Sequence, residues 1–177
     1  DCFTPYGTQL FAPFSDYRVA FNNISVADPL YTFPFLICII VALFFKRKNP
    51  KKIKWTKTGI YLSSFYLLFT VGNKLYMDTV FKKSFQKAGI SMNRFSAQPT
   101  IFNNILWYGV AETETDFYLG FYSLLDKDAE IKEWKKISKQ HQLIPVEDIN
   151  IQTLMWFSNG YYNVRLSRDK GVYNYID

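Results

Sequence analysis

Residues 28–57 read DPLYTFPFLICIIVALFFKRKNPKKIKWTK, and this stretch decides the fold prediction. Residues 29–45 carry no charge, whereas residues 46–57 hold seven lysines and arginines and no acid. A second uncharged segment, 58–73, follows directly. As a helix the first segment is about 25 Å long, which is the short end of what crosses a bilayer. We therefore expect two transmembrane helices that form a hairpin, the second continuing as an amphipathic extension, over residues 29–92.

The basic segment 46–57 is typical of a cytoplasmic loop between two spans. The positive-inside rule then places this segment in the cytoplasm and both ends of the chain outside it. Two alternatives stay open: the apolar segments as buried core helices, and the basic segment as a solvated loop of a soluble protein. The pairing of two apolar segments around one basic turn favours the hairpin.

The charge distribution argues against a nucleic-acid-binding protein. The net charge is +6, and the basic segment supplies seven positive charges, so the rest of the chain carries −1. A nucleic-acid-binding protein spreads its positive charge over a contact surface. We therefore expect no nucleic-acid partner.

The second apolar segment carries a polar stripe. Its members recur at spacings of three and four and so share one helix face; they are Ser63, Tyr66, Thr70 and Asn73. Polar groups in a bilayer need partners, so we expect this face to point toward other helices. Structural packing and the lining of a site both remain open as its role.

From about residue 93 the pattern changes to that of a small soluble α+β domain over residues 93–177. Segments 105–111 and 117–124 are rich in aromatic and branched residues and predict two antiparallel strands. Segment 130–137 fits either a helix or a strand. Segment 146–158 predicts a helix with Gly160 as its C-cap, and segments 161–167 and 172–176 predict a second hairpin.

Residues 1–28, which we expect to form an extracytoplasmic loop, hold the candidate site. Thr4-Pro5-Tyr6-Gly7 has the residue types of a tight turn, and Asp1 comes just before it. Asp28 precedes the first apolar segment. The two carboxylates are candidate ligands of a divalent cation. Asp28 has a second interpretation, because an aspartate before a proline is also a common helix N-cap.

Two motifs carry a family resemblance: residues 1–15, DCFTPYGTQLFAPFS, and residues 28–31, DPLY. With the segments 103–108, 120–124 and 157–162, they resemble the YdjM-like family of bacterial inner-membrane metal-dependent hydrolases. The resemblance implies a divalent metal, zinc or manganese, held by histidines and aspartates of upstream helices, with Asp1 at the aspartate position of the turn motif. Since that histidine motif is missing, we expect the chain to be a fragment whose partners are the bilayer and upstream transmembrane helices of the same protein.

Two functions follow from these patterns. The first is the C-terminal part of a membrane-bound metal-dependent hydrolase, in which the metal activates a water molecule. The second is a non-catalytic membrane-tethered binding or assembly protein that acts through its α+β domain. The α+β domain has no Gly-x-Ser-x-Gly motif and no phosphate loop, so no catalytic residue is predicted in it.

Overall fold

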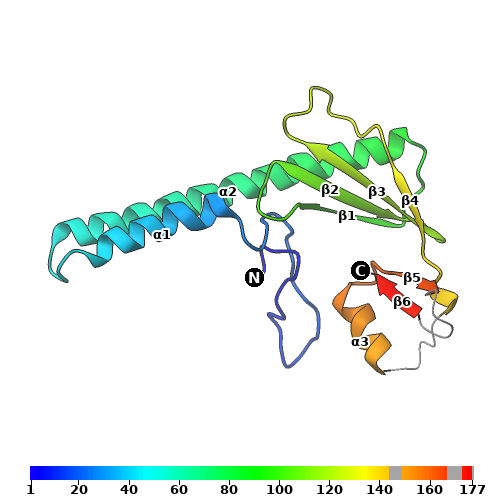
Figure 1. The fold of residues 1–177 in the computed structure, drawn as a ribbon, viewed down its shortest axis with the longest axis horizontal. Helices are drawn as coiled ribbons and strands as arrows, with labels where there is room; N and C mark the ends of the chain where they lie inside the picture. The colour runs from blue at the N-terminus through cyan, green and yellow to red at the C-terminus, as the bar shows by residue number, and fades with distance from the viewer. Residues whose placement is uncertain (144–148, 167–172, 177) are drawn as a thin grey trace.

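The computed structural model describes residues 1–143, 149–166 and 173–176. Two helices form an elongated hairpin, and a four-stranded antiparallel sheet lies along the far half of the longer helix (Figure 1). A smaller unit of one helix and two strands lies beside the sheet, and the N-terminal segment 1–28 runs between this unit and the base of the hairpin (Figure 1).

The hairpin is built from α1 (Pro29–Leu43) and α2 (Pro50–Lys87). Each helix starts with a proline after a side-chain cap: Asp28 Oδ1 accepts from Leu30 N at 2.9 Å, and Asn49 Oδ1 accepts from Lys51 N at 2.9 Å. The connection is therefore short, and most of the basic segment forms the first turns of α2 instead of a loop.

The prediction of two transmembrane helices is wrong. Among the described residues, no helix is both long enough and apolar enough to cross a membrane. With 15 residues, α1 is about 22 Å long, whereas the hydrocarbon layer is about 30 Å thick. The 38 residues of α2 are long enough, but lysines at its start and polar residues along its length lower its hydropathy. The predicted cytoplasmic location of the basic segment 46–57 rested on these two transmembrane helices. Without them, the positive-inside rule no longer supports that location.

The sheet is a meander in the order β1-β2-β3-β4. Its strands are β1 (Arg94–Pro99), β2 (Leu106–Glu112), β3 (Asp116–Ser123) and β4 (Lys135–Ser138). The predicted strand pair 105–111 and 117–124 corresponds to β2 and β3, and the ambiguous segment 130–137 contributes the start of β4. All neighbouring strands are antiparallel.

Side chains alternate between the two faces of this sheet, as strand geometry requires. One face, the helix face, packs on the C-terminal half of α2 and forms the main core with Met77, Val80, Phe81, Phe85, Ala97, Trp107, Ala111, Tyr122 and Ile131. Gly109 permits the closest approach, since a Cβ there would lie 2.3 Å from Cδ1 of the fully buried Phe81. The opposite face is not covered by α2.

The smaller unit contains a 3-10 turn (His141–Leu143), α3 (Ile149–Phe157), β5 (Asn163–Leu166) and β6 (Tyr173–Ile176). The predicted helix 146–158 corresponds to α3, although its residues 146–148 lie outside the described residues. Gly160 has a φ of 75°, as expected for a residue that ends a helix. Strands β5 and β6 pair antiparallel, as the predicted hairpin requires, and its connection 168–171 also lies outside the described residues.

Candidate functional site

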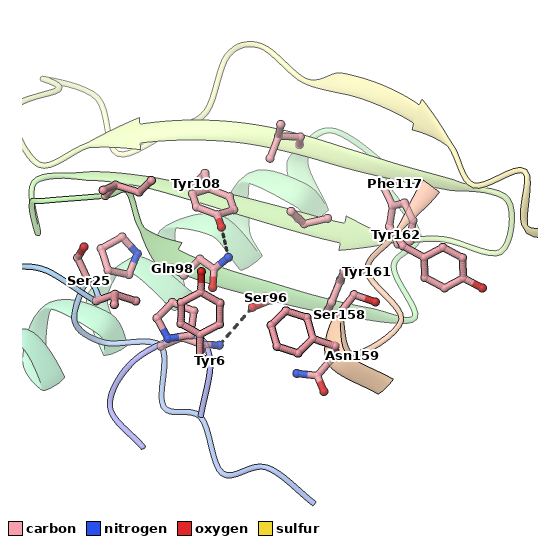
Figure 2. Close-up of a pocket in the computed structure, with 18 of the residues that line it drawn as sticks. Tyr6, Ser25, Ser96, Gln98, Tyr108, Phe117, Ser158, Asn159, Tyr161 and Tyr162 are labelled. Carbon is pink, nitrogen blue, oxygen red and sulfur yellow. Dashed lines mark hydrogen bonds between the residues drawn. The ribbon is translucent and has the colours of Figure 1, made fainter. Parts of the chain in front are cut away.

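A cavity of about 850 Å³ lies between the sheet, the N-terminal segment and the smaller unit. Figure 2 shows side chains from all three parts converging on it, including Tyr6, Gln98, Tyr108 and Tyr161. Ligand sites commonly have volumes of about 300–1,000 Å³ and combine apolar walls with a few placed polar groups. The cavity has this size and this composition.

The floor of the cavity is the sheet face opposite α2, which we call the cavity face. It consists of alternate residues of all four strands: Ser96, Gln98, Tyr108, Val110, Phe117, Leu119, Lys135 and Ile137. The antiparallel register places Gln98 opposite Tyr108, and the Gln98 amide donates a hydrogen bond to the Tyr108 hydroxyl (Figure 2). The floor is therefore mixed, with apolar residues between hydroxyl and amide groups.

Arg18 joins the N-terminal segment to the smaller unit at one wall of the cavity. Its Nη1 donates to Tyr6 O at 3.1 Å, and its Nη2 donates to Trp156 O at 3.0 Å and to Phe157 O. The guanidinium also lies over the Trp156 ring, 4.5 Å from the centroid. These acceptors are the exposed carbonyls at the end of α3, so one cation caps that helix and fixes it against the N-terminal segment.

A buried network of asparagines fixes the N-terminal segment on its other side. Asn23 Nδ2 donates to Thr70 Oγ1 at 2.8 Å, and Asn104 Nδ2 donates to Asn23 O at 2.8 Å. Asn73 Nδ2 donates to Asn104 O at 2.8 Å. The segment is thereby attached to both α2 and the β1–β2 connection, and these attachments set the position of the cavity wall.

A charge cluster around Glu112 lies next to Phe117, a cavity residue that pairs with Glu112 across β2 and β3. The carboxylate accepts from Lys139 Nζ at 2.7 Å and from Arg94. Burial alone would raise the pKa of Glu112, but the hydrogen bonds from Lys139 and Arg94 outweigh it and hold that pKa below its ordinary value. The Arg94 guanidinium also lies 4.3 Å from the centroid of the Tyr161 ring. This contact orients Tyr161, which lines the cavity.

The two carboxylates predicted as metal ligands have different surroundings. Asp1 is exposed beside the predicted turn, where Thr4 N donates to Asp1 O at 2.9 Å. Asp28 is buried and caps α1, and its Oδ2 accepts from the Tyr66 hydroxyl at 2.8 Å. No group of three His, Cys, Asp or Glu side chains that could hold a metal occurs within the described residues. These residues do not by themselves fit a divalent metal.

The other residues of the predicted site have local structural contacts. Gly7 closes the turn with a φ of 67°, and Gly7 N donates to Thr4 O at 3.3 Å, while Pro5 lines the cavity. On α2, Ser63 donates to a carbonyl of its own helix. The stripe residues Tyr66, Thr70 and Asn73 face the N-terminal segment and the β1–β2 connection, where sequence patterns predicted other helices.

Burial and the hydrogen bond to Asp28 raise the pKa of the Tyr66 hydroxyl well above its ordinary value. Tyr66 therefore stays protonated and keeps donating to Asp28, which makes this contact a structural one.

Apart from Pro5 and Tyr6 of the predicted turn, sequence patterns did not single out the cavity residues. The alternation of Ser96 and Gln98 with Ala97 is a local signal for a strand with one polar face. Arg18, Asn163 and Arg165 gave no comparable signal, because they meet only through contacts between distant parts of the chain.

A family model described as YdjM inner membrane protein matches residues 1–77. The resemblance predicted from the sequence is thereby confirmed for this segment, and the match supports membrane association and a location at the inner membrane. The segments of the resemblance after residue 77 lie outside the match. No curated protein and no solved structure matches.

Proposed function

We propose that this chain, whose residues 1–77 match the YdjM inner membrane protein family model, is a membrane-associated binding protein that holds a small ligand in the cavity. The observation that carries the proposal is the cavity of about 850 Å³ with its mixed aromatic and polar lining. No Asp, Glu, His or Cys is among its described lining residues, so the lining supplies hydrogen-bonding and cationic groups but no carboxylate, imidazole or thiol.

The hairpin is the part that we assign to membrane contact. It exposes large apolar side chains on both helices, among them Phe33, Leu43, Phe65 and Leu68. Contiguous exposed apolar surface marks a contact with a partner or a membrane. The basic segment 46–57 lies at the end of this hairpin, and clustered lysines bind anionic lipid headgroups with roughly 1 kcal/mol per charge.

Vesicle cosedimentation tests the membrane assignment. The change is the triple variant Lys51→Glu, Lys54→Glu and Lys57→Glu, whose side chains are exposed. Phosphatidylglycerol vesicles should retain the native chain, and the variant should bind at least tenfold more weakly. The matched control reverses three exposed lysines elsewhere, Lys82, Lys83 and Lys127. Equal loss of binding in both triple variants would contradict the assignment.

A blocked cavity tests the binding function. Leu119 lies on the cavity face, and Leu119→Trp should fill space there and abolish binding of a ligand found by screening a metabolite library on the native chain. Phe121→Trp is the matched control, because Phe121 lies on the same strand and face but is exposed outside the cavity lining. A ligand that binds both variants as it binds the native chain would refute the assignment of the cavity.

A metal-dependent hydrolase is the second candidate. The resemblance drawn from the sequence supports it, because Asp1 and the turn Thr4–Gly7 stand where that resemblance expects a metal-binding aspartate. The exposed Asp1 carboxylate is available as one ligand, and the other ligands would come from outside the described residues.

Metal analysis of the purified full-length protein separates the two candidates. The hydrolase predicts stoichiometric zinc or manganese that Asp1→Asn reduces. Absence of both metals, with no effect of the variant, would reject the hydrolase and leave the binding function standing.

A further inference from the structure

Polar atoms without a partner gather at the cavity. Among the described residues, four buried side-chain atoms have no hydrogen-bond partner, and three belong to cavity residues: Arg18 Nε, Asn22 Oδ1 and Asn163 Oδ1. Asn163 is only 5% exposed. A buried group without a partner costs about 1–3 kcal/mol, so native structures keep few of them. The three residues line one cavity, so a rotation of their side chains on binding would bring these atoms to a ligand.

The chemistry of these atoms defines what the ligand must offer. The two asparagine oxygens accept hydrogen bonds, so the ligand must carry donors at two places. Arg18 Nε donates, so the ligand must also carry an acceptor nearby. Hydroxyl groups meet both needs, since each hydroxyl donates one hydrogen bond and accepts others.

The cationic side chains of the lining indicate that the ligand also carries an anionic group. Lys135 on β4 and Arg165 on β5 line the cavity, and neither has an ion pair among the described residues. Asn163 and Arg165 are two residues apart on β5 and so share the strand face that meets the cavity. The acceptor and the cation therefore lie side by side.

Aromatic rings stand on three sides of the cavity. Tyr6 comes from the N-terminal segment, Tyr108 from the sheet and Tyr161 from the smaller unit (Figure 2). Phe157 of the smaller unit also lines the cavity. Such rings pack on the apolar faces of flat or ring-shaped ligands while the hydroxyl of tyrosine keeps a polar contact. A polyol with ring faces fits these walls better than an extended acyl chain.

We propose that the cavity binds an acidic saccharide, a sugar that presents ring hydroxyls to Asn22 and Asn163 and a carboxylate or phosphate to Lys135 and Arg165. This assignment rests on the proposed binding function and specifies its ligand class. Hydroxyl donors satisfy the two buried acceptors, and the anionic group supplies the counter-charge that the lining lacks.

Calorimetric titration of the full chain with three probes tests the class: tetragalacturonate, the neutral maltotetraose, and AMP as an anionic nucleotide. Tetragalacturonate should bind at least tenfold more tightly than maltotetraose and AMP. The acidic sugar can belong to a membrane lipid or to a free glycan, and a glucuronosyl diacylglycerol in nanodiscs separates these two sources. Tighter binding of the nanodiscs would assign the sugar to a membrane lipid. Tighter binding of tetragalacturonate would assign it to a free glycan.

Two variants connect the affinity to the cavity. Lys135→Gln should weaken tetragalacturonate binding about fivefold to tenfold and leave maltotetraose unaffected, because charged hydrogen bonds are the stronger ones. Lys136→Gln is the matched control: Lys136 is the next residue on β4, pairs with Asp116 at 3.1 Å and is not among the cavity residues. It should change neither affinity.

Three outcomes would overturn the inference. Equal affinity for tetragalacturonate and maltotetraose would show that the cavity does not recognise an anionic group. Loss of the binding of both saccharides in Leu119→Trp would still support the binding function. Tighter binding of AMP than of tetragalacturonate would show that the cavity selects a nucleotide and not a saccharide. No binding of any probe or library compound to the native chain would overturn both the ligand class and the binding function.

Discussion

Asn163 offers the sharpest test, because its stability effect and its binding effect should have opposite signs. Its side chain is 95% buried on β5, and its Oδ1 has no partner. Leucine has nearly the same shape and no polar atom. Asn163→Leu therefore removes an unsatisfied group, and we expect the free energy of unfolding to rise by about 1 kcal/mol or more.

Asn104 is the matched control. It is 2% exposed, but its amide donates to Asn23 O and its Oδ1 accepts from Asn73. Asn104→Leu breaks two buried hydrogen bonds and leaves partners unpaired, so we expect the free energy of unfolding to fall by about 2–4 kcal/mol. The same chemical change should thus have opposite effects at two buried sites.

Urea unfolding followed by circular dichroism measures both changes. With a slope of about 2 kcal/mol/M, Asn163→Leu should raise the midpoint by about 0.5 M, and Asn104→Leu should lower it by at least 1 M. Tetragalacturonate binding should be lost in Asn163→Leu. A residue kept at a cost in stability is expected where binding requires it. Destabilisation by Asn163→Leu similar to that of Asn104→Leu would refute the reasoning.

Three further predictions concern the parts that frame the cavity. Gly109→Ala would place a Cβ 2.3 Å from the buried Phe81 ring, so the free energy of unfolding should fall by about 1–3 kcal/mol in urea titration; an unchanged midpoint would contradict the packing. Arg18→Lys keeps the charge but loses the forked donation to Tyr6, Trp156 and Phe157, so hydrogen exchange over residues 149–157 should accelerate; unchanged exchange would show that Arg18 does not hold α3. Burial, followed by contact with Tyr76, raises the pKa of Tyr122 to about 12. Because the unfolded value is about 10, the associated stability is complete below pH 10 and is lost as the pH rises toward 12; Tyr122→Phe should reduce the decline in unfolding free energy between pH 9 and 11, and an equally steep decline would contradict this origin.

The helices and the central strands could be predicted from local patterns. Asp28 and Asn49 each precede a proline, and both cap a helix that begins at that proline. The uncharged segment 29–45 predicted a helix correctly, but the same absence of charge does not distinguish a span from a shorter helix. The observed length of α1, 15 residues, is what distinguishes a shorter helix from a membrane span here. Packing of α1 on α2 is helped by Gly59, where a Cβ would lie 2.9 Å from Cys38 Cβ.

The cavity could not be predicted from local patterns because its walls come from distant segments. The Arg18 guanidinium reaches carbonyls about 140 residues later in the chain, and no periodicity of either segment encodes that contact. The polar stripe was visible as a helical face, but its partners were not: Thr70 and Asn73 meet Asn23 and Asn104, which lie in irregular segments. Spacing indicates which side chains share a face, and tertiary contacts decide what that face meets.

Hydrogen exchange of the full chain, with and without saturating tetragalacturonate, tests the central claim of a ligand-binding cavity most directly. Binding should slow exchange at β1, at residues 18–25 and at β5, which together surround the cavity, and should leave the connection 44–49 at the far end of the hairpin unchanged. Unchanged exchange in all three cavity segments at saturation, or protection confined to the hairpin, would contradict the account.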